Sequence, residues 1–184
     1  MPLTSKIVLH SLRFNPRDNF GHSNGREEEN LVKKFAIHYA DNFTRIHKRS
    51  NPDHVTLVRE VPVNSLGISD LVAISWKADV KRIKLRDYVI RSFEFKINDW
   101  KKGLMQAYRY NYYSDASILV MPENKHSIVK NYLTTFYELN VGMWFYDSAK
   151  DKVNVVFTPR PKKPEDPSKR DLLIQNILES VDIN

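Results

Sequence analysis

The fold is decided by residues 88–121, YVIRSFEFKINDWKKGLMQAYRYNYYSDASILVM, which contain the patterns of a strand, a helix and a second strand. Residues 88–97 carry apolar side chains on both faces, which is typical of a strand at the centre of a sheet. Residues 99–112 have helical spacing with Asp99 as the expected N-cap, and residues 116–121 form a fully apolar run. A helix that connects two buried strands predicts that the strands are parallel.

The flanking segments extend this unit into an α/β fold. Apolar periodicity and turn residues predict two further helices and two hairpins. The helices are expected at residues 26–43 and 125–139, and the hairpins at 54–63 with 68–76 and at 141–146 with 152–158. We therefore predict a central mixed β-sheet flanked by helices on both faces.

The chain is predicted to divide after its terminal hairpin. Residues 1–158 are expected to form one domain, and residues 159–184 a Pro- and Lys-rich linker followed by an amphipathic helix. Ser168 and Asp171 have the spacing of a capping box at the start of this helix. The helix is expected either to dock on its own domain or to pair with a second copy of the chain.

Composition restricts the classes of function. The chain has 184 residues and no cysteine, which excludes disulfides, a thiol nucleophile and a cysteine-held iron–sulfur cluster. No apolar run reaches the ~18 residues that a membrane span needs, so we expect a soluble, cytoplasmic protein with no membrane contact. The net charge of +7 favours a polyanionic partner, because cations that neutralise phosphates release condensed counterions.

Charged residues on two neighbouring strands are the candidates for chemistry. Glu94 and Lys96 lie two apart on one strand and so share a face, where burial costs free energy unless other charges compensate. Asp70 begins an adjacent strand, so that its carboxylate could meet that of Glu94. With the carbonyl of Phe95, these carboxylates suit Mg²⁺, which prefers oxygen ligands, and Mn²⁺ as a substitute. The alternatives are that Asp70 bonds its own turn and that Lys96 pairs with Glu94 alone.

An acidic triplet opens the first predicted helix. Glu28 shares a face with Leu31 and Phe35, so it can point toward the sheet and a metal. Glu27 and Glu29 are less well aligned with that face. The alternative is that the triplet complements the helix dipole and has no other role.

The helix predicted at residues 99–112 has a polar face that includes Lys102, Gln106 and Arg109. Gln106 could hold a water molecule or a phosphate oxygen, or its face could be solvated and have no further role. Cations and tyrosines that could contact nucleic acid occur here and in an earlier basic stretch. The candidates are Lys101, Lys102, Arg109 and Tyr110, with Lys81, Arg82 and Lys84.

In their order along the predicted elements, these residues resemble the PD-(D/E)xK nuclease superfamily, which includes restriction enzymes, Holliday junction resolvases and RecB-type nucleases. The resemblance covers residues 26–121, and Gln106-x-x-x-Tyr110 also resembles a motif of RecB-type members. Ser69 stands where the family has proline, a residue without a ligand role. The resemblance implies a restriction-endonuclease-like sheet. It also implies metal binding by Glu28, Asp70, Glu94 and the Phe95 carbonyl, and catalysis by Asp70, Glu94, Lys96 and Gln106.

The resulting expectation is a Mg²⁺-dependent DNA endonuclease, possessing a resolvase-like preference for DNA structure. DNA is the expected partner, together with a second copy of the chain, since cutting both strands of a duplex suits a two-fold dimer. Two alternatives stay open. One is a catalytically silent nucleic-acid-binding or assembly module on the same fold, and the other is a basic scaffold with no role on DNA.

Overall fold

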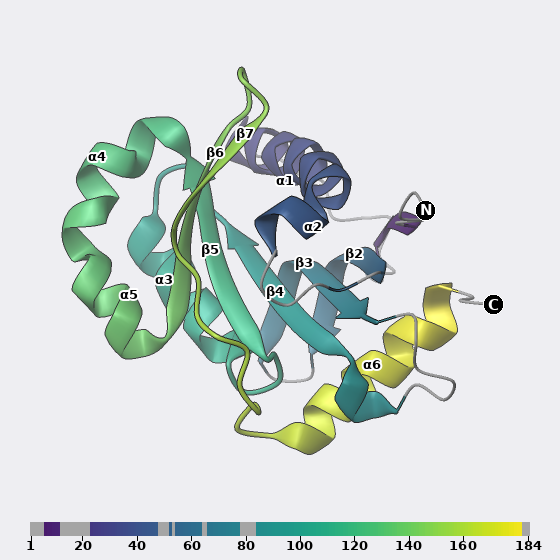
Figure 1. Cartoon of the computed structure of the whole chain (residues 1–184). Coiled ribbons are helices and arrows are strands. Elements are labelled where there is room, and N and C mark those ends of the chain that lie inside the picture. Colours follow the sequence, from purple (N-terminus) through teal and green to yellow (C-terminus); the bar gives the residue numbers. More distant parts are fainter. Residues whose placement is uncertain are drawn as a thin grey trace.

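A computed structural model describes residues 6–11, 23–47, 52, 54–63, 66–77 and 84–181, with side chains from residue 27 to residue 177 within these ranges. In this part of the chain, seven strands form one mixed sheet whose spatial order equals the sequence order (Figure 1). The strands are β1 (Lys6–Ser11), β2 (His54–Val63), β3 (Gly67–Trp76), β4 (Val89–Phe95), β5 (Ala116–Pro122), β6 (Val141–Asp147) and β7 (Lys152–Phe157).

Strand pairing follows the predicted pattern. The pairs β2–β3 and β6–β7 are antiparallel, which confirms both predicted hairpins. The β4–β5 pair is parallel, as predicted from the helix that connects the two strands. The pairs β1–β2 and β5–β6 are also parallel, and β3–β4 is antiparallel, so the sheet is mixed.

Helices cover both faces of the sheet (Figure 1). Helices α1 and α2 pack on one face, and α3, α5 and α6 pack on the other. The helices are α1 (Ser23–Asp41), α2 (Phe43–Ile46), α3 (Trp100–Tyr110), α4 (His126–Val129), α5 (Leu133–Leu139) and α6 (Pro167–Val181). The observed fold is therefore α/β with a mixed sheet between helices.

Two predicted helices are interrupted. The helix expected at 26–43 begins at Ser23 and ends at Asp41, before the separate turn α2. The helix expected at 125–139 is divided into α4, a 3₁₀ turn and α5. At both breaks an asparagine amide donates to the carbonyl four residues earlier, from Asn42 to His38 and from Asn131 to Ser127. The backbone N–H of Asn42 also donates to the His38 carbonyl, at 3.0 Å, so two donors of one residue share this acceptor at the end of α1.

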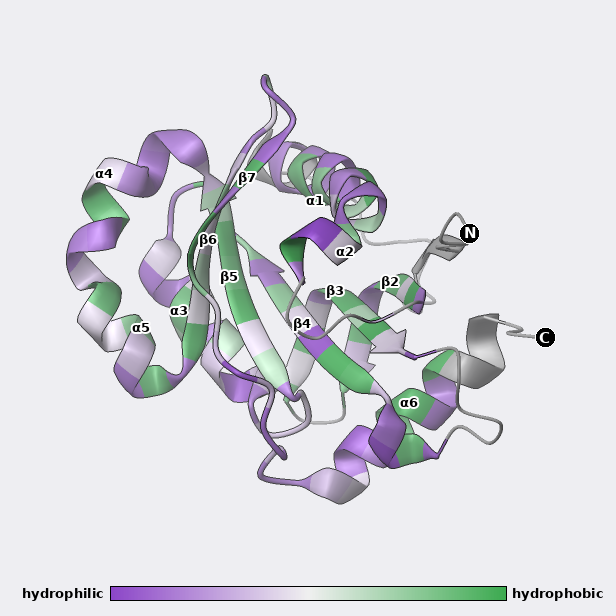
Figure 2. Ribbon diagram, in the orientation of Figure 1, coloured by the Kyte–Doolittle hydropathy of each residue, from purple (hydrophilic) through white to green (hydrophobic). Residues whose placement is uncertain are grey.

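An aromatic cluster fills the core on the α1 face. Phe35 of α1 contacts Phe93 and Phe95 of β4, with ring centroids 5.5 and 5.1 Å apart, and Trp144 of β6 lies beside them. Burial of each such side chain stabilises the fold by about 1.5–3 kcal/mol. Hydrophobic residues also run along much of β5 at the centre of the sheet (Figure 2).

The C-terminal helix α6 docks on its own domain. Leu173, Ile174 and Ile177 are buried against side chains of β2, β3 and β4. The preceding segment is held by backbone hydrogen bonds, from Lys162 N–H to the Asp115 carbonyl (2.9 Å) among others. The segment predicted as a linker is therefore held against the turn between α3 and β5.

The predicted capping box of α6 is wrong. Asp166 caps the helix, because its Oδ1 accepts from the Lys169 N–H at 3.2 Å and from the Ser168 hydroxyl at 2.5 Å. Pro167 takes the first helical position, where a missing N–H costs nothing. Asp171 instead accepts a hydrogen bond from Arg170.

Candidate active site

The register of β3 and β4 brings the predicted acidic residues together. Leu71 pairs with Phe93 across the antiparallel ladder, so Asp70 and Glu94 stand opposite each other one step further along. Helix α3 begins immediately after β4, where the Asp99 carboxylate accepts from the Lys102 N–H at 3.1 Å, as predicted for its cap. The site therefore lies at the C-terminal end of β4.

Lys96 lies at the centre of this cluster. Its ammonium nitrogen is 2.7 Å from Glu94 Oε1, donates to the Phe95 carbonyl at 3.0 Å, and is 3.8 Å from Glu28 Oε2. The Glu94 side chain is 1 % exposed and that of Lys96 is 13 % exposed. A buried carboxylate of this kind is tolerated because the ammonium compensates its charge. Lys96 therefore pairs with two glutamates, Glu94 and Glu28. The simpler alternative, a pair with Glu94 alone, does not describe this arrangement.

Asp70 is fixed across the sheet. Its Oδ2 accepts the N–H of Phe95 at 2.8 Å. This bond reaches a neighbouring strand, so the alternative of a turn residue bonding its own local backbone does not describe it. The bond holds the Asp70 carboxylate beside the Glu94–Lys96 pair.

The structure distinguishes the three glutamates of α1. Glu28 Oε1 accepts from the Ile97 N–H at 3.4 Å, which turns Glu28 toward the end of β4. Glu29 instead pairs with Lys33 at 2.7 Å and lies 3.8 Å from Arg59. Glu27 is exposed to solvent. Glu28 is thus the member of the triplet that joins the cluster.

Tyr110 has a different place from the one predicted. Its side chain is 1 % exposed, so its ring does not face a partner on the surface, and its prediction as a nucleic-acid contact is wrong. Its hydroxyl instead lies within hydrogen-bond distance of Glu94 Oε2 and of the Ile68 carbonyl, the latter at 2.8 Å, and its single proton is donated to one of these two acceptors at a time. Helix α3 therefore holds the Glu94 carboxylate from above the sheet. The one-turn spacing of Gln106 and Tyr110 was the signal that could have placed both toward the sheet.

Gln106 carries an unsatisfied acceptor. Its Oε1 is buried and has no hydrogen-bond partner among the residues that the structure describes. A buried polar atom without a partner costs about 1–3 kcal/mol. Gln106 lies one helical turn before Tyr110, on the helix that covers Glu94. A bound water or ligand donor would satisfy this oxygen.

Gly103 was not anticipated as part of the site. A Cβ atom at this position would lie 2.6 Å from Lys96 Cγ and 2.7 Å from Leu119 Cδ1. The absence of a side chain lets α3 approach β4 and β5 closely, with the Lys96 stem between them. Gly103 therefore sets where the Lys96 ammonium can lie.

The cluster holds more carboxyl groups than cations. Burial, followed by the Glu94 charge, raises the pKa of Asp70 to about 8. Burial also raises the pKa of Glu94, against the opposing effect of Lys96. Burial lowers the pKa of Lys96, but the Glu94 and Asp70 carboxylates outweigh it and raise that pKa overall. One ammonium thus faces three carboxyl groups, of which Asp70 mostly holds its proton at neutral pH, and a bound cation would favour their ionised forms.

The donor atoms suit a hard divalent cation in kind. Carboxylates of Asp70, Glu94 and Glu28 and the Phe95 carbonyl are all oxygen ligands. In the described parts of the chain, however, no group of three or more His, Asp or Glu side chains has the spacing of a metal site. The Lys96 ammonium already contacts Glu94 Oε1 and the Phe95 carbonyl. A metal ion that used these two oxygens would therefore have to displace the ammonium from them.

Only some of the residues that were predicted to contact nucleic acid lie near this cluster. Lys101, Lys102 and Arg109 are exposed along α3. Lys84 is exposed but precedes β4, at the strand end opposite to Lys96. Lys81 and Arg82 lie outside the described residues.

Comparison of the chain with protein-family models, with curated proteins and with solved structures finds no match. None of the helices in the described ranges is both long enough and apolar enough to cross a membrane.

Proposed function

We propose that this chain is a Mg²⁺-dependent DNA nuclease of the PD-(D/E)xK type. The observation that carries the proposal is the convergence of Asp70, Glu94 and Lys96 at the end of β4, with Glu28 reaching the same point from α1. The restriction-endonuclease-like core that we propose runs from α1 through the β2–β3–β4 meander to the α3 crossover and β5. It is supported by the order of these elements, which is the order in which the resembling motifs occur.

The metal would be held by Asp70, Glu94, Glu28 and the Phe95 carbonyl. When bound, Mg²⁺ supplies a water of lowered pKa and neutralises charge on the phosphate. Lys96 is proposed to orient the attacking water and to stabilise the negative charge that develops on the phosphate. Gln106 Oε1 is proposed to accept a hydrogen bond from that water, which would satisfy its unpaired oxygen.

The proposed substrate is DNA, bound through exposed cations. Lys101 and Lys102 open α3 close to the end of β4, and Arg109 follows two turns later. The net charge of +7 adds a long-range attraction for the phosphate backbone. A two-fold homodimer acting on intracellular DNA is part of the proposal, and light scattering tests it through the mass in solution.

A second candidate is a catalytically silent nucleic-acid-binding module on the same fold. It is favoured by the ion pair in which Lys96 neutralises Glu94, together with the lack of a spaced group of metal ligands within the described residues. Such a module would bind DNA through the same cations and would cleave nothing.

Cleavage of three labelled DNAs separates the candidates. Linear duplex, single-stranded and four-way-junction DNA are incubated with Mg²⁺, Mn²⁺ or EDTA, with the wild type and with Asp70→Asn. The nuclease proposal predicts cleavage that requires a metal and falls at least ~100-fold in the variant, because a ligand is lost. The preferred DNA then identifies the substrate class. Salt-sensitive binding without any cleavage would support the silent module instead.

The acidic triplet offers a matched control. Glu28→Gln is expected to weaken cleavage, whereas Glu27→Gln removes the same charge at an exposed neighbouring position and is expected to leave cleavage unchanged. Equal effects of the two substitutions would argue that only the total charge of the helix matters.

A further inference from the structure

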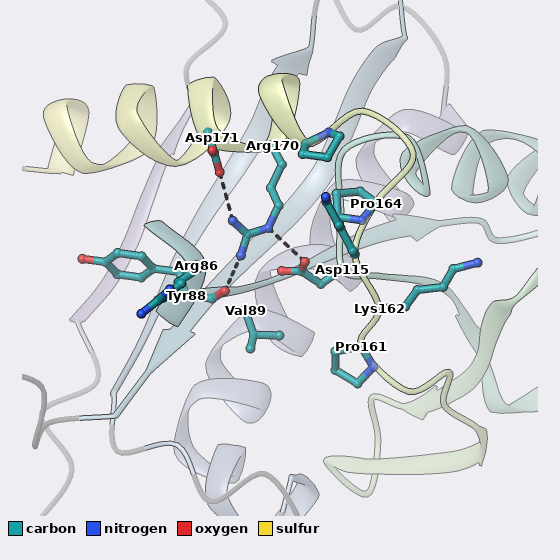
Figure 3. A pocket seen from close by; sticks show the side chains of 11 residues that line it. Arg86, Tyr88, Val89, Asp115, Pro161, Lys162, Pro164, Arg170 and Asp171 are labelled. Carbon is teal, nitrogen blue, oxygen red and sulfur yellow. Dashed lines mark hydrogen bonds and ion pairs between the residues drawn. The ribbon is translucent and has the colours of Figure 1, made fainter. Parts of the chain in front are cut away.

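A cavity of about 510 Å³ lies at the end of β4 opposite to Lys96. It is enclosed by the start of β4, by residues 161–164 and by the first turn of α6 (Figure 3). Strand β4 has seven residues, which at about 3.3 Å per residue separates the cavity from the proposed active site by roughly 20 Å. The cavity is thus distinct from that site.

Arg170 forms the base of the cavity and neutralises its acidic groups. The guanidinium donates to Asp115 Oδ1 at 2.9 Å, to Asp171 Oδ1 at 3.1 Å and to the Tyr88 carbonyl (Figure 3). It also donates to the Leu85 carbonyl at 3.0 Å. Asp115 Oδ2 accepts a hydrogen bond from a backbone N–H of β4. Both carboxylates that line the cavity are therefore already paired.

Cations on the rim are not compensated in this way. Lys162 and Lys163 are exposed, and no ion pair within the described residues engages them. Arg86 is 78 % exposed and lies 3.8 Å from Asp87, a long contact that is worth little on a surface. Arg86 and Lys162 stand on opposite sides of Arg170 (Figure 3). Four cations against two carboxylates leave an excess of positive charge, so the cavity favours an anion.

The walls between these cations are flat and apolar. Val89 lies on one side, and the rings of Pro161 and Pro164 lie on the other, whereas the Tyr88 ring points away from the prolines (Figure 3) and packs against Trp76 with ring centroids 5.6 Å apart. Surfaces of this kind suit the apolar face of a planar base, which gains free energy when it is removed from water. The volume lies in the range of sites for small molecules. An anion with a planar apolar part is the ligand that matches both properties.

We propose that this cavity binds one nucleotide unit, with its base between Val89 and the prolines and its phosphate at Lys162 and Lys163. The nucleotide comes either from a free mononucleotide or from the phosphorylated end of a DNA strand. No metal and no cleavage are needed for this binding, so the assignment stands apart from the nuclease proposal.

Calorimetric titration in EDTA tests the assignment. Deoxythymidine monophosphate, thymidine, inorganic phosphate and a trinucleotide with or without a 5′-phosphate are titrated into the full chain. The phosphorylated nucleotide is expected to bind at least ~10-fold more tightly than thymidine, because charge-assisted hydrogen bonds to the phosphate are lost in the nucleoside. It is also expected to bind more tightly than inorganic phosphate, which lacks the base.

Charge reversal on the rim locates the site. The exposed pair Lys162→Glu/Lys163→Glu is expected to weaken binding at least ~10-fold. Arg86→Glu, on the opposite side of Arg170, is expected to weaken it less than this pair does. The control Lys150→Glu/Lys152→Glu makes the same charge change on the exposed β6–β7 hairpin and is expected to weaken binding less than ~2-fold. Circular dichroism confirms that each variant is folded.

Two results would support the assignment, and each identifies where the bound nucleotide comes from. Binding of the mononucleotide indicates a free ligand, whereas binding of the 5′-phosphorylated trinucleotide alone indicates a DNA end. The assignment is overturned if neither binds, if inorganic phosphate binds as tightly as the nucleotide, or if the control pair weakens binding as much as the rim variants. These results do not depend on cleavage, so failure here leaves the nuclease proposal to be decided by its own assay.

Discussion

The Tyr110 hydroxyl reaches both Glu94 Oε2 and the Ile68 carbonyl, so one side chain of α3 connects the catalytic candidate on β4 to the neighbouring strand β3. Glu94 therefore has a hydrogen-bond partner on one oxygen and the Lys96 ammonium on the other. This arrangement fixes the orientation of the carboxylate. It also makes Tyr110 a positioning residue for any ligand that Glu94 binds.

Removal of that hydroxyl tests the positioning role. We expect Tyr110→Phe to lower metal affinity or activity by ~10–100-fold, as the loss of a partner that orients a metal ligand usually does. The measurement is the cleavage rate as a function of Mg²⁺ concentration. Tyr108→Phe, on the same helix, serves as the control. A Mg²⁺ dependence of Tyr110→Phe that equals the wild type would contradict the role, since a merely structural hydroxyl would change stability alone.

Substitution of Lys96 separates metal binding from catalysis. The ammonium occupies Glu94 Oε1 and the Phe95 carbonyl, so Lys96→Met is expected to bind Mn²⁺ more tightly while it loses cleavage. Without metal, the variant leaves Glu94 buried and uncompensated, which costs about 3–5 kcal/mol of stability. Calorimetric Mn²⁺ titration and thermal unfolding with and without Mn²⁺ measure these effects. Lys102→Met is the control, and retained cleavage by Lys96→Met would exclude a catalytic role.

A methyl group at Gly103 probes the space around Lys96. Gly→Ala in a helix interior normally stabilises by up to about 1 kcal/mol. Here the added Cβ would lie 2.6 Å from Lys96 Cγ, so we expect a net loss of about 1–3 kcal/mol from overpacking and a fall in cleavage. Urea unfolding and the cleavage assay measure both. Met105→Ala, at an exposed position of α3, should change neither; stabilisation by Gly103→Ala would show that Lys96 can move freely.

His47 is expected to make stability depend on pH. Burial, with a contribution from Arg91, lowers its pKa to about 3, and its Nε2 is 2.7 Å from the Tyr39 hydroxyl. In the unfolded chain a histidine binds a proton below a pH of about 6.5. On acidification, His47 therefore binds a proton in the unfolded state at a higher pH than in the folded state. The stability due to neutral His47 is complete above about pH 6.5 and decreases by up to about 1.4 kcal/mol per pH unit toward pH 3.

The measurement is the free energy of unfolding in urea at pH 7 and pH 5. The wild type should lose about 2 kcal/mol more than His47→Gln over this interval. His54→Gln, at a half-buried position on β2, is the control and should keep the wild-type slope. Equal slopes for the wild type and His47→Gln would mean that His47 is protonated in the folded protein.

The architecture was predicted from the sequence because strands and helices are indicated by patterns of residues that lie close together in the chain. The apolar run of β5 and the mixed run of β4 identified two central strands, and the helix between them required a parallel pair. The ends of the helices were missed where an asparagine side chain bonds a carbonyl one turn earlier, as those of Asn42 and Asn131 do. Such a bond depends on the rotamer that one side chain adopts, which periodicity does not reveal.

The sequence predicted which residues form the site, but it did not predict most of the contacts between them. Placement of Glu94 and Lys96 on one face follows from the period of a strand, and Asp70 meets Glu94 because the two strands are neighbours, as expected. The burial of Tyr110 and the close approach of Gly103 depend on how α3 crosses β4, which is set by packing between elements. Orientation of Glu28 toward Ile97 is likewise a tertiary contact between residues 69 positions apart.

The central claim is that the Asp70–Glu94–Lys96 cluster hydrolyses DNA with a bound metal ion. Its most direct test is the cleavage rate of a labelled DNA with Mg²⁺ and with EDTA, for the wild type and for the isosteric variant Glu94→Gln. The account predicts cleavage by the wild type that EDTA abolishes, and a rate for Glu94→Gln that is lower by at least ~100-fold. Cleavage that persists in EDTA, or that is unchanged by Glu94→Gln, would contradict it.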